Sequence, residues 1–241
     1  MDWIAALRTL RAARIAAFSD ADRSGSSLVA QATNNGYDIR VVGSINWWFG
    51  TDVLVIVDEV LEARPESVNL YLDSPGGDLF DAMALRAALD SLAQTGTHIQ
   101  AQAGGIVASA AVPVFLTGAV REAQTYTRFM VHNPRAWFVV EGTLADMDSA
   151  MVDFRSLMEA ATGLYWDSIS SHVDAATVTG WQESNQDVWH TAAEAEELGI
   201  LTGATDEPPV NSTDGIEEAV ARLAEQRARA VAAFYQRQRR R

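Results

Sequence analysis

Hydrophobic and polar positions alternate along most of the chain with two different periods. From residue 38 onward, short apolar runs typical of buried strands are followed by segments whose apolar side chains recur at helical spacing. This repetition predicts an α/β fold with a mostly parallel sheet and helices outside it. The predicted strands cover residues 39–42, 68–72, 99–103, 122–126 and 128–131, and the predicted helices cover residues 53–62, 78–93, 108–117, 144–162 and 191–198.

The two ends of the chain do not follow this alternation. Residues 2–18 carry apolar side chains near one face and arginines on another, which predicts a short helix. Residues 19–37 are rich in Ser, Asn, Asp and Gly, as flexible linkers are. Residues 206–214 contain two adjacent prolines and predict a second linker, which leads into a final helix. We therefore expect an N-terminal helix and linker over residues 1–37, an α/β domain over 38–204, and a linker and basic helix over 205–241.

The residue types that are missing narrow the chemistry of the chain. Its 241 residues include no cysteine, and all 18 basic residues are arginines. Without thiols there can be no disulfide, no cysteine nucleophile and no thiolate zinc site, and without lysine there can be no Schiff base and no Ser–Lys dyad. We expect neither a metal nor a cofactor. An imidazole base must come from His98, His132, His172 or His190.

Charge is distributed unevenly along the chain. The 32 acidic residues give a net charge of −14, so most of the surface is expected to repel nucleic acid and anionic membranes. Residues 216–241 are the exception, with seven arginines against three glutamates, and this tail suits an acidic partner or nucleic acid. No apolar run approaches the roughly 20 residues of a membrane span. We therefore expect a cytoplasmic protein that makes no membrane contact.

Two glycine-rich turns differ from their surroundings. Residues 72–78, Leu-Asp-Ser-Pro-Gly-Gly-Asp, connect a predicted strand to a helix, and residues 104–111 place Ser109 among small residues after a glycine pair. Each turn alone is also a common strand–helix connection. Together, one turn can supply backbone N–H groups that hold an oxyanion, and the other can supply a hydroxyl nucleophile at a helix N-terminus.

A hydroxyl nucleophile requires a base, and the composition leaves only histidine for that role. His132 follows the apolar strand predicted over residues 128–131, so it should emerge at the carboxyl edge of the sheet, where α/β proteins bind ligands. His98 begins a strand after a turn and is expected at the surface. His172 and His190 lie in settings that favour structural roles. His132 is therefore the candidate base.

The order of three motifs resembles the Clp protease proteolytic-subunit (ClpP-like) family of serine peptidases. The motifs are Ser-Pro-Gly-Gly at residues 74–77, Gly-x-x-Ala-Ser-Ala-Ala at 105–111 and Met-Val-His-Asn-Pro at 130–134. Residues 70–85 and 189–200 are similar to its phage-borne branch of head-maturation proteases. The resemblance covers about residues 38–202. It implies a crotonase-like spiral of strand–strand–helix units, an extended "handle" helix that interlocks two rings, and a ring-forming homo-oligomer.

The resemblance also implies roles for individual residues. Ser109 would be the nucleophile and His132 its base, and the third member would be Asp174, with Glu183 and Asp187 as open alternatives. The oxyanion-hole donors would be the N–H groups of Gly76 and Ala110, and the substrate would lie against Gly77 and Asp78 as an added strand.

The function that follows is an ATP-independent serine endopeptidase with a Ser-His-Asp mechanism. Its polypeptide substrate would be capsid or scaffold protein, cut in the host cytoplasm or the phage procapsid. One alternative is a cellular Clp-type subunit that works with an unfoldase ATPase. Another is an inactive assembly protein that keeps only the fold. A crotonase-like acyl-CoA enzyme has no need of Ser109 and His132 together.

Overall fold

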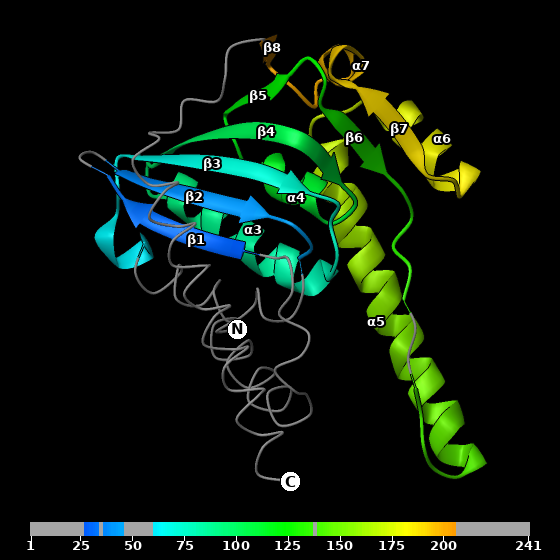
Figure 1. Ribbon diagram of the computed structural model, residues 1–241. Helices are drawn as coiled ribbons and strands as arrows, with labels where there is room; N and C mark the ends of the chain where they lie inside the picture. The colour runs from blue at the N-terminus through cyan, green and yellow to red at the C-terminus, as the bar shows by residue number, and fades with distance from the viewer. Residues whose placement is uncertain (1–26, 34–35, 46–59, 137–138, 206–241) are drawn as a thin grey trace, which may run out of the picture. The chain divides into compact units, whose positions relative to one another are not determined.

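The computed structural model describes residues 27–33, 36–45, 60–136 and 139–205. Within these ranges the strands are β1 (Ser27–Ala32), β2 (Gly36–Val42), β3 (Ser67–Ser74), β4 (His98–Ala108), β5 (Val120–Gln124), β6 (Arg128–Val131), β7 (Val188–Thr191) and β8 (Gly203–Thr205). They form one sheet with the order β1-β2-β3-β4-β5-β8, while β6 pairs with β4 and β7 pairs with β6 (Figure 1). The predicted helix over 2–18, most of the helix over 53–62, the second linker and the basic C-terminal helix lie outside the described residues.

The sheet is mixed but mostly parallel. Among the described strands only the β1–β2 and β6–β7 pairs are antiparallel, and the other pairs run parallel. The prediction of a mostly parallel α/β sheet is therefore confirmed. Strand β4 has two partners in succession, because Gln100–Ala103 pair with β5 whereas Ile106–Ala108 pair with β6. This change of partner brings the end of β4 beside the end of β6.

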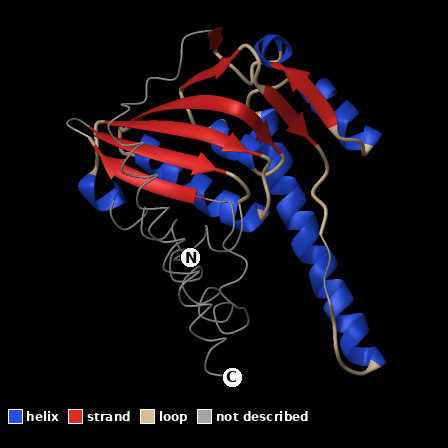
Figure 2. Ribbon diagram, in the orientation of Figure 1, coloured by secondary structure: helices blue, strands red, loops and turns tan. Residues whose placement is uncertain are grey.

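Helices α3 (Leu79–Gln94) and α4 (Ala111–Phe115) cover one face of the central strands. Helix α5 (Leu144–Ser170) packs on these two helices, α6 (Ala175–Ser184) packs on α5, and α7 (Ala192–Glu197) lies against β6, β7 and β8. Figure 2 shows α3 and α4 together on one side of the sheet. Strand β3 illustrates why: its even-numbered residues Val68, Leu70 and Leu72 are buried in the core, whereas the residues between them are more exposed. Such alternation is typical of a strand with one packed face.

The structure corrects the predicted N-terminal linker. Residues 27–32 form β1, which pairs antiparallel with β2 from Ser27↔Val42 to Ala32↔Tyr37, so the sheet begins inside the segment predicted as flexible. The Ser-, Asn-, Asp- and Gly-rich residues on either side concealed this strand, in which Leu28 is buried in the core. A backbone hydrogen bond of 2.8 Å from Thr33 N–H to the Gly36 carbonyl closes the turn between the two strands.

Two further boundaries differ from prediction. Strand β4 continues through Gly104 and Gly105 to Ala108, and α4 begins only at Ala111. The glycines permit this, because a Cβ on Gly104 would lie 2.4 Å from the hydroxyl of Tyr71 on the adjacent β3. The long helix predicted over 144–162 continues to Ser170, and α6 and β7 lie between this helix and the helix predicted from residue 191, where the sequence predicted no element.

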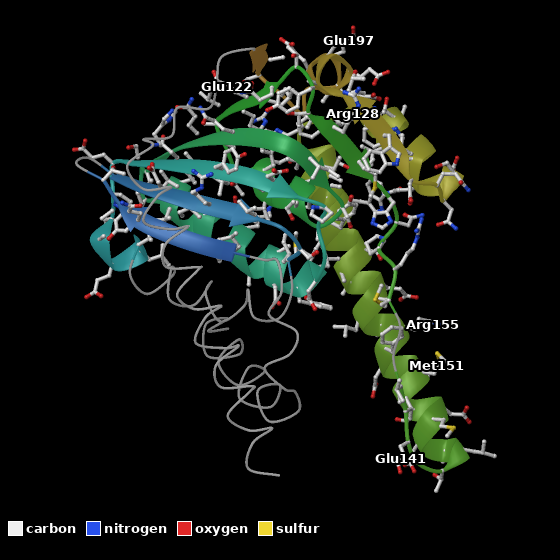
Figure 3. The ribbon with its side chains drawn as sticks, viewed as in Figure 1. Glu122, Arg128, Glu141, Met151, Arg155 and Glu197 are labelled. Carbon is white, nitrogen blue, oxygen red and sulfur yellow. The ribbon has the colours of Figure 1, made fainter. Side chains whose placement is uncertain are left out.

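Helix α5 has two different halves. It begins at a capping box formed by Thr143 and Asp146, and its 27 residues span about 40 Å. Its C-terminal half buries Tyr165, Trp166 and Ile169 in the core. Its N-terminal half extends away from the sheet, past the labelled Arg155 and Met151 (Figure 3). This half leaves a row of apolar side chains exposed, among them Leu144, Met147 and Met151. Neither α5 nor any other helix in the described ranges is both long and apolar enough to cross a membrane.

Candidate active site

Ser109 occupies a tight turn between β4 and α4. Its φ of 53° lies in the left-handed region, which a residue with a side chain adopts only when its surroundings impose it. Two backbone hydrogen bonds do so here: Ser109 N–H donates to the Met130 carbonyl at 2.8 Å, and Val112 N–H donates to the Ser109 carbonyl at 3.0 Å. The first continues the β4–β6 ladder by one residue, so the ladder itself sets the position of the serine.

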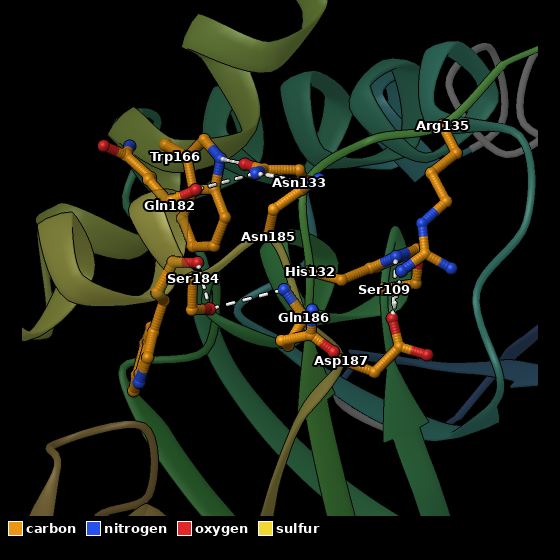
Figure 4. Close-up of polar contacts among 11 residues, drawn as sticks. Ser109, His132, Asn133, Arg135, Trp166, Gln182, Ser184, Asn185, Gln186 and Asp187 are labelled. Carbon is orange, nitrogen blue, oxygen red and sulfur yellow. Dashed lines mark hydrogen bonds and ion pairs between the residues drawn. The ribbon is translucent and has the colours of Figure 1, made fainter.

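Ser109 and His132 are in direct contact. The serine Oγ lies 2.7 Å from Nε2 of His132, which is the residue that follows β6 (Figure 4). This distance suits a hydroxyl that donates to the imidazole when the ring proton is on Nδ1, the arrangement of a nucleophile and its general base. The two residues that the sequence singled out are thus brought together by the pairing of their strands.

Asp187 is the carboxylate that lies beside His132. Its Oδ1 is 3.5 Å from His132 Nδ1 and 2.5 Å from Nη2 of Arg135. The β6–β7 register explains its place, because Val131 pairs with Val188 and the next residues outward on the two strands are His132 and Asp187. Facing residues of an antiparallel pair lie close enough for their side chains to interact.

Asp174, predicted as the third member, has a different role, and this prediction is corrected. It is the N-cap of α6: its carboxylate accepts hydrogen bonds from Ala176 N–H at 2.9 Å and Thr177 N–H at 3.2 Å, and from the Thr177 hydroxyl. These bonds from Thr177 hold the pKa of Asp174 below its usual value. Glu183 lies within α6 with its side chain exposed. Asp187 was not chosen from the sequence because strand β7, which follows it, is only four residues long and was not predicted.

The Ser-Pro-Gly-Gly turn packs directly against the serine turn. A Cβ on Gly76 would lie 2.7 Å from the Ser109 Cβ and 2.8 Å from the Ala110 nitrogen, so only glycine allows this approach. Gly76 is buried, and its N–H donates to the Ser74 hydroxyl at 3.1 Å. The prediction that Gly76 N–H serves the oxyanion is therefore corrected, because that N–H is already engaged and turned inward.

Gly77 takes the place that was predicted for Gly76. It is exposed, with a φ of 145°, and it lies with Ala110 on the wall of the cavity that contains Ser109. Within the described residues, neither the Gly77 nor the Ala110 N–H donates to a hydrogen-bond acceptor. These two backbone donors, on either side of the serine, are the groups that can stabilise a developing negative charge.

The cavity beside Ser109 has a volume of about 260 Å³. Residues 77–80 line part of it, and the Asp78 carboxylate there caps α3 by accepting from Phe80 N–H at 2.9 Å. Side chains of α5 and of the segment after β6 line it as well. The remaining lining residues are Ser109, Ala110, His132, Pro134, Arg135, Ala136, Met158, Ala161 and Tyr165. Gly77 and Asp78, predicted to contact substrate, therefore both face this cavity.

The surroundings of His132 favour its neutral form. Burial lowers the pKa of His132, the positive charge of Arg135 lowers it further, and the negative charge of Asp187 acts in the opposite direction. A neutral imidazole can accept a proton from Ser109.

Asn133 links the histidine to the turn that carries Asp187. Its side-chain NH₂ donates to the Gln182 carbonyl at 2.9 Å and to the Asn185 amide oxygen at 3.1 Å, and its own oxygen accepts from the Trp166 indole N–H at 3.0 Å (Figure 4). Asn185 ends α6 in the left-handed conformation, with a φ of 50°. One side chain thus fastens the segment after β6 to α5 and to the end of α6, next to the turn that leads into β7.

Comparisons with known proteins agree with this arrangement. The family model described as Clp protease matches residues 31–207. The "ATP-dependent Clp protease proteolytic subunit" of Bacteroides thetaiotaomicron is 26% identical over 138 residues, which are 56% of this chain and 59% of that protein. That of Porphyromonas gingivalis is 28% identical over 138 residues, 56% of this chain and 58% of that protein. The "proteolytic subunit 2" of Corynebacterium efficiens is 28% identical over 144 residues, 58% of this chain and 67% of that protein.

The matched region thus spans about three fifths of the length of the first of these relatives. The family model, by contrast, covers most of the present chain and includes both glycine-rich turns, the Ser109–His132 contact and the strand that carries Asp187 to the site. With its mixed α/β sheet and this match, the chain belongs to the Clp protease family.

Proposed function

We propose that the chain is a serine endopeptidase in which Ser109 is the nucleophile, His132 the general base and Asp187 the third member. The observation that carries the proposal is the 2.7 Å contact between Ser109 Oγ and His132 Nε2, at the wall of a cavity that also presents two backbone N–H donors. The left-handed backbone of Ser109 supports it, because strained residues gather at active sites.

The reaction follows from these positions. Ser109 Oγ attacks a peptide carbonyl while His132 Nε2 takes the hydroxyl proton, and the carbonyl oxygen becomes an oxyanion that accepts from the N–H groups of Gly77 and Ala110. The C–N bond then breaks, and His132 gives its proton to the leaving amine. Water attacks the resulting ester by the same route and regenerates the serine. Asp187 stabilises the imidazolium that forms in both steps.

The substrate is a polypeptide that lies along residues 77–80, and the active form contains several copies of the chain. The position of residues 77–80 on the cavity wall supports the first part. The row of exposed apolar side chains on the N-terminal half of α5 supports the second, since such a row is unusual on a surface that stays in water. In this proposal the monomer has the crotonase-like spiral and α5 is the handle between rings. Sedimentation analysis tests it by measuring the mass of the particle.

Two cellular settings fit this chemistry, and different observations support them. The likeness of residues 70–85 to phage head-maturation proteases supports an enzyme that cuts capsid or scaffold protein without an ATPase. The names of the relatives, which are ATP-dependent Clp protease proteolytic subunits, support a subunit that works with an ATPase. Digestion of an unfolded protein such as casein by the purified chain alone distinguishes them: rapid digestion without nucleotide favours the first.

Labelling with a fluorophosphonate probe tests the proposed chemistry. The probe should modify Ser109, as located by mass spectrometry, and the modification should be lost in Ser109→Ala and in His132→Ala. Ser171→Ala is a matched control, because this exposed hydroxyl donates to the Ser168 carbonyl at the end of α5, and it should label as the wild type does. A folded, assembled protein that gains no adduct at Ser109 would be an assembly protein that keeps only the fold.

A further inference from the structure

One oxygen of Asp187 serves two cationic or protonatable partners. Arg135 Nη2 lies 2.5 Å from Oδ1, whereas His132 Nδ1 lies 3.5 Å from the same atom, beyond ordinary hydrogen-bond length (Figure 4). The carboxylate is thus bound to the arginine and only close to the histidine. The arginine and aspartate are partly exposed, with 61% and 42% of their side chains accessible, so either can move without disturbing the core.

This arrangement leaves Nδ1 of His132 without a hydrogen-bond acceptor among the described residues. Its side chain is 14% exposed, and within the described residues Nδ1 is a buried polar atom without a hydrogen-bond partner. A buried N–H that lacks an acceptor costs free energy, and a histidine base needs that acceptor to hold its tautomer and to stabilise its charged form. The acceptor is present within reach but is turned toward Arg135.

The charged and titratable groups around His132 come from four elements. Asp187 faces it from the start of β7 and Arg135 from the segment after β6, and Tyr165 of α5 and Asp78 of the turn before α3 line the same cavity. Tyr165 is buried, which raises its pKa and keeps it neutral, and the Asp78 carboxylate is engaged in capping α3. Besides burial, which lowers the pKa of His132 most, Arg135 and Asp187 are the two charged groups that change how well His132 accepts a proton.

We propose that Arg135 is a positioning residue that competes with His132 for the Asp187 carboxylate and so restrains the Ser109–His132 pair until the arginine releases it. The inference rests on the proposed serine-peptidase function. Release of Asp187 by Arg135 has two consequences, and both strengthen His132 as a base. Asp187 closes on Nδ1 and stabilises the imidazolium, and a positive charge leaves the vicinity of a group that must itself become positive.

The rate of fluorophosphonate labelling as a function of pH tests this inference without a known substrate. In Arg135→Ala, the limiting rate at high pH should rise by roughly threefold to tenfold, because the base is stronger. The pH midpoint of the rate should move upward by about one pH unit, as expected when a charge at this range is removed. The two curves therefore cross, with the variant slower at low pH and faster at high pH, and loss of a merely structural side chain does not produce a crossing.

Conservative variants separate the charge from the hydrogen bond. Arg135→Lys keeps the charge and should keep a midpoint close to that of the wild type. Arg135→Gln keeps a donor for Asp187 without the charge, and its midpoint should move as in Arg135→Ala. Arg128→Ala is the matched control: this arginine lies at the other end of β6, where it donates to the carbonyls of Tyr126 and Thr127, and its loss should leave the profile unchanged.

A double-variant cycle shows whether Arg135 acts through Asp187. In an Asp187→Asn background, Arg135→Ala should raise the limiting rate clearly less than it does in the wild type, because the carboxylate for which the two residues compete is gone and only the loss of the positive charge remains. A limiting rate that is unchanged or lower in Arg135→Ala overturns the inference, as does a gain of equal size in the two backgrounds. If the wild type labels at Ser109, such results reject only the role of Arg135. If the wild type does not label at all, the proposed function itself fails.

Discussion

Substitution of Gly76 by alanine is the sharpest test of how the two turns build the site. The added Cβ would lie 2.5 Å from the Ala108 carbonyl oxygen, 2.7 Å from the Ser109 Cβ and 2.8 Å from the Ala110 nitrogen, all on or next to the serine turn. The φ of 87° at Gly76 adds a backbone penalty of about 1–2 kcal/mol for a residue with a side chain. Relief of the overlap costs about 1–3 kcal/mol more. We expect a loss of about 2–5 kcal/mol in the free energy of unfolding.

The effect on labelling should exceed the effect on stability. The overlap pushes on Ser109 itself, and a displacement of about 1 Å at a reacting group costs on the order of 100-fold in rate. Gly96→Ala is the matched control, because Gly96 also has a positive φ, of 98°, but a Cβ there meets no atom within 4 Å. Its free energy of unfolding should fall only by the backbone penalty, and its labelling rate should match that of the wild type. A Gly76→Ala protein that labels as fast as Gly96→Ala would refute the idea that this contact sets the serine position.

Two further predictions separate catalytic from structural carboxylates and fix the pH range of the site. Asp187→Asn should slow fluorophosphonate labelling at least tenfold with little change in melting temperature. Asp174→Ala should lower the melting temperature through loss of the α6 cap and leave labelling unchanged. The opposite pattern would restore Asp174 as the third member. Because burial lowers the pKa of His132, the labelling rate should fall with decreasing pH through a midpoint below the ordinary value of 6.5. The folded protein holds His132 in its neutral form, so the free energy of unfolding should also decrease as the pH falls below 6.5 and the histidine of the unfolded chain becomes protonated. A labelling midpoint above 6.5, measured by rate against pH, contradicts this account of its surroundings.

The parts of the site that the sequence predicted are those defined by local pattern. Ser109 and His132 each stand where an apolar strand ends, and the carboxyl ends of neighbouring parallel strands meet at one edge of a sheet. Local pattern identified the end of β6 before His132, whereas Ser109 was singled out by its glycine-rich turn and not by the end of β4, which lies five residues beyond the predicted strand. The parallel sheet then brought the two residues together.

The predictions that were wrong concern features that depend on strand pairing or backbone angles and not on local pattern. Asp187 reaches the site through the register of two antiparallel strands, one of them four residues long, and a pairing of this kind leaves no mark on the neighbouring sequence. Asp174 was predicted from the family resemblance, which does not show that this aspartate caps α6. The choice between Gly76 and Gly77 depends on two backbone angles, 87° and 145°, that direct one N–H inward and leave the other at the cavity. Strand β1 was missed because its six residues lie between stretches rich in Ser, Asn, Asp and Gly, so the whole segment was predicted as a linker.

The β6–β7 ladder also determines where the chain tolerates changes in length. Asp187 owes its position to its distance along the chain from Val188, which is paired with Val131, and not to its distance from α6. Residues can therefore be inserted or deleted on the α6 side of the Asn185 turn while the carboxylate keeps its place. A single residue inserted between Asp187 and Val188 would turn the aspartate to the other face of the strand, away from His132.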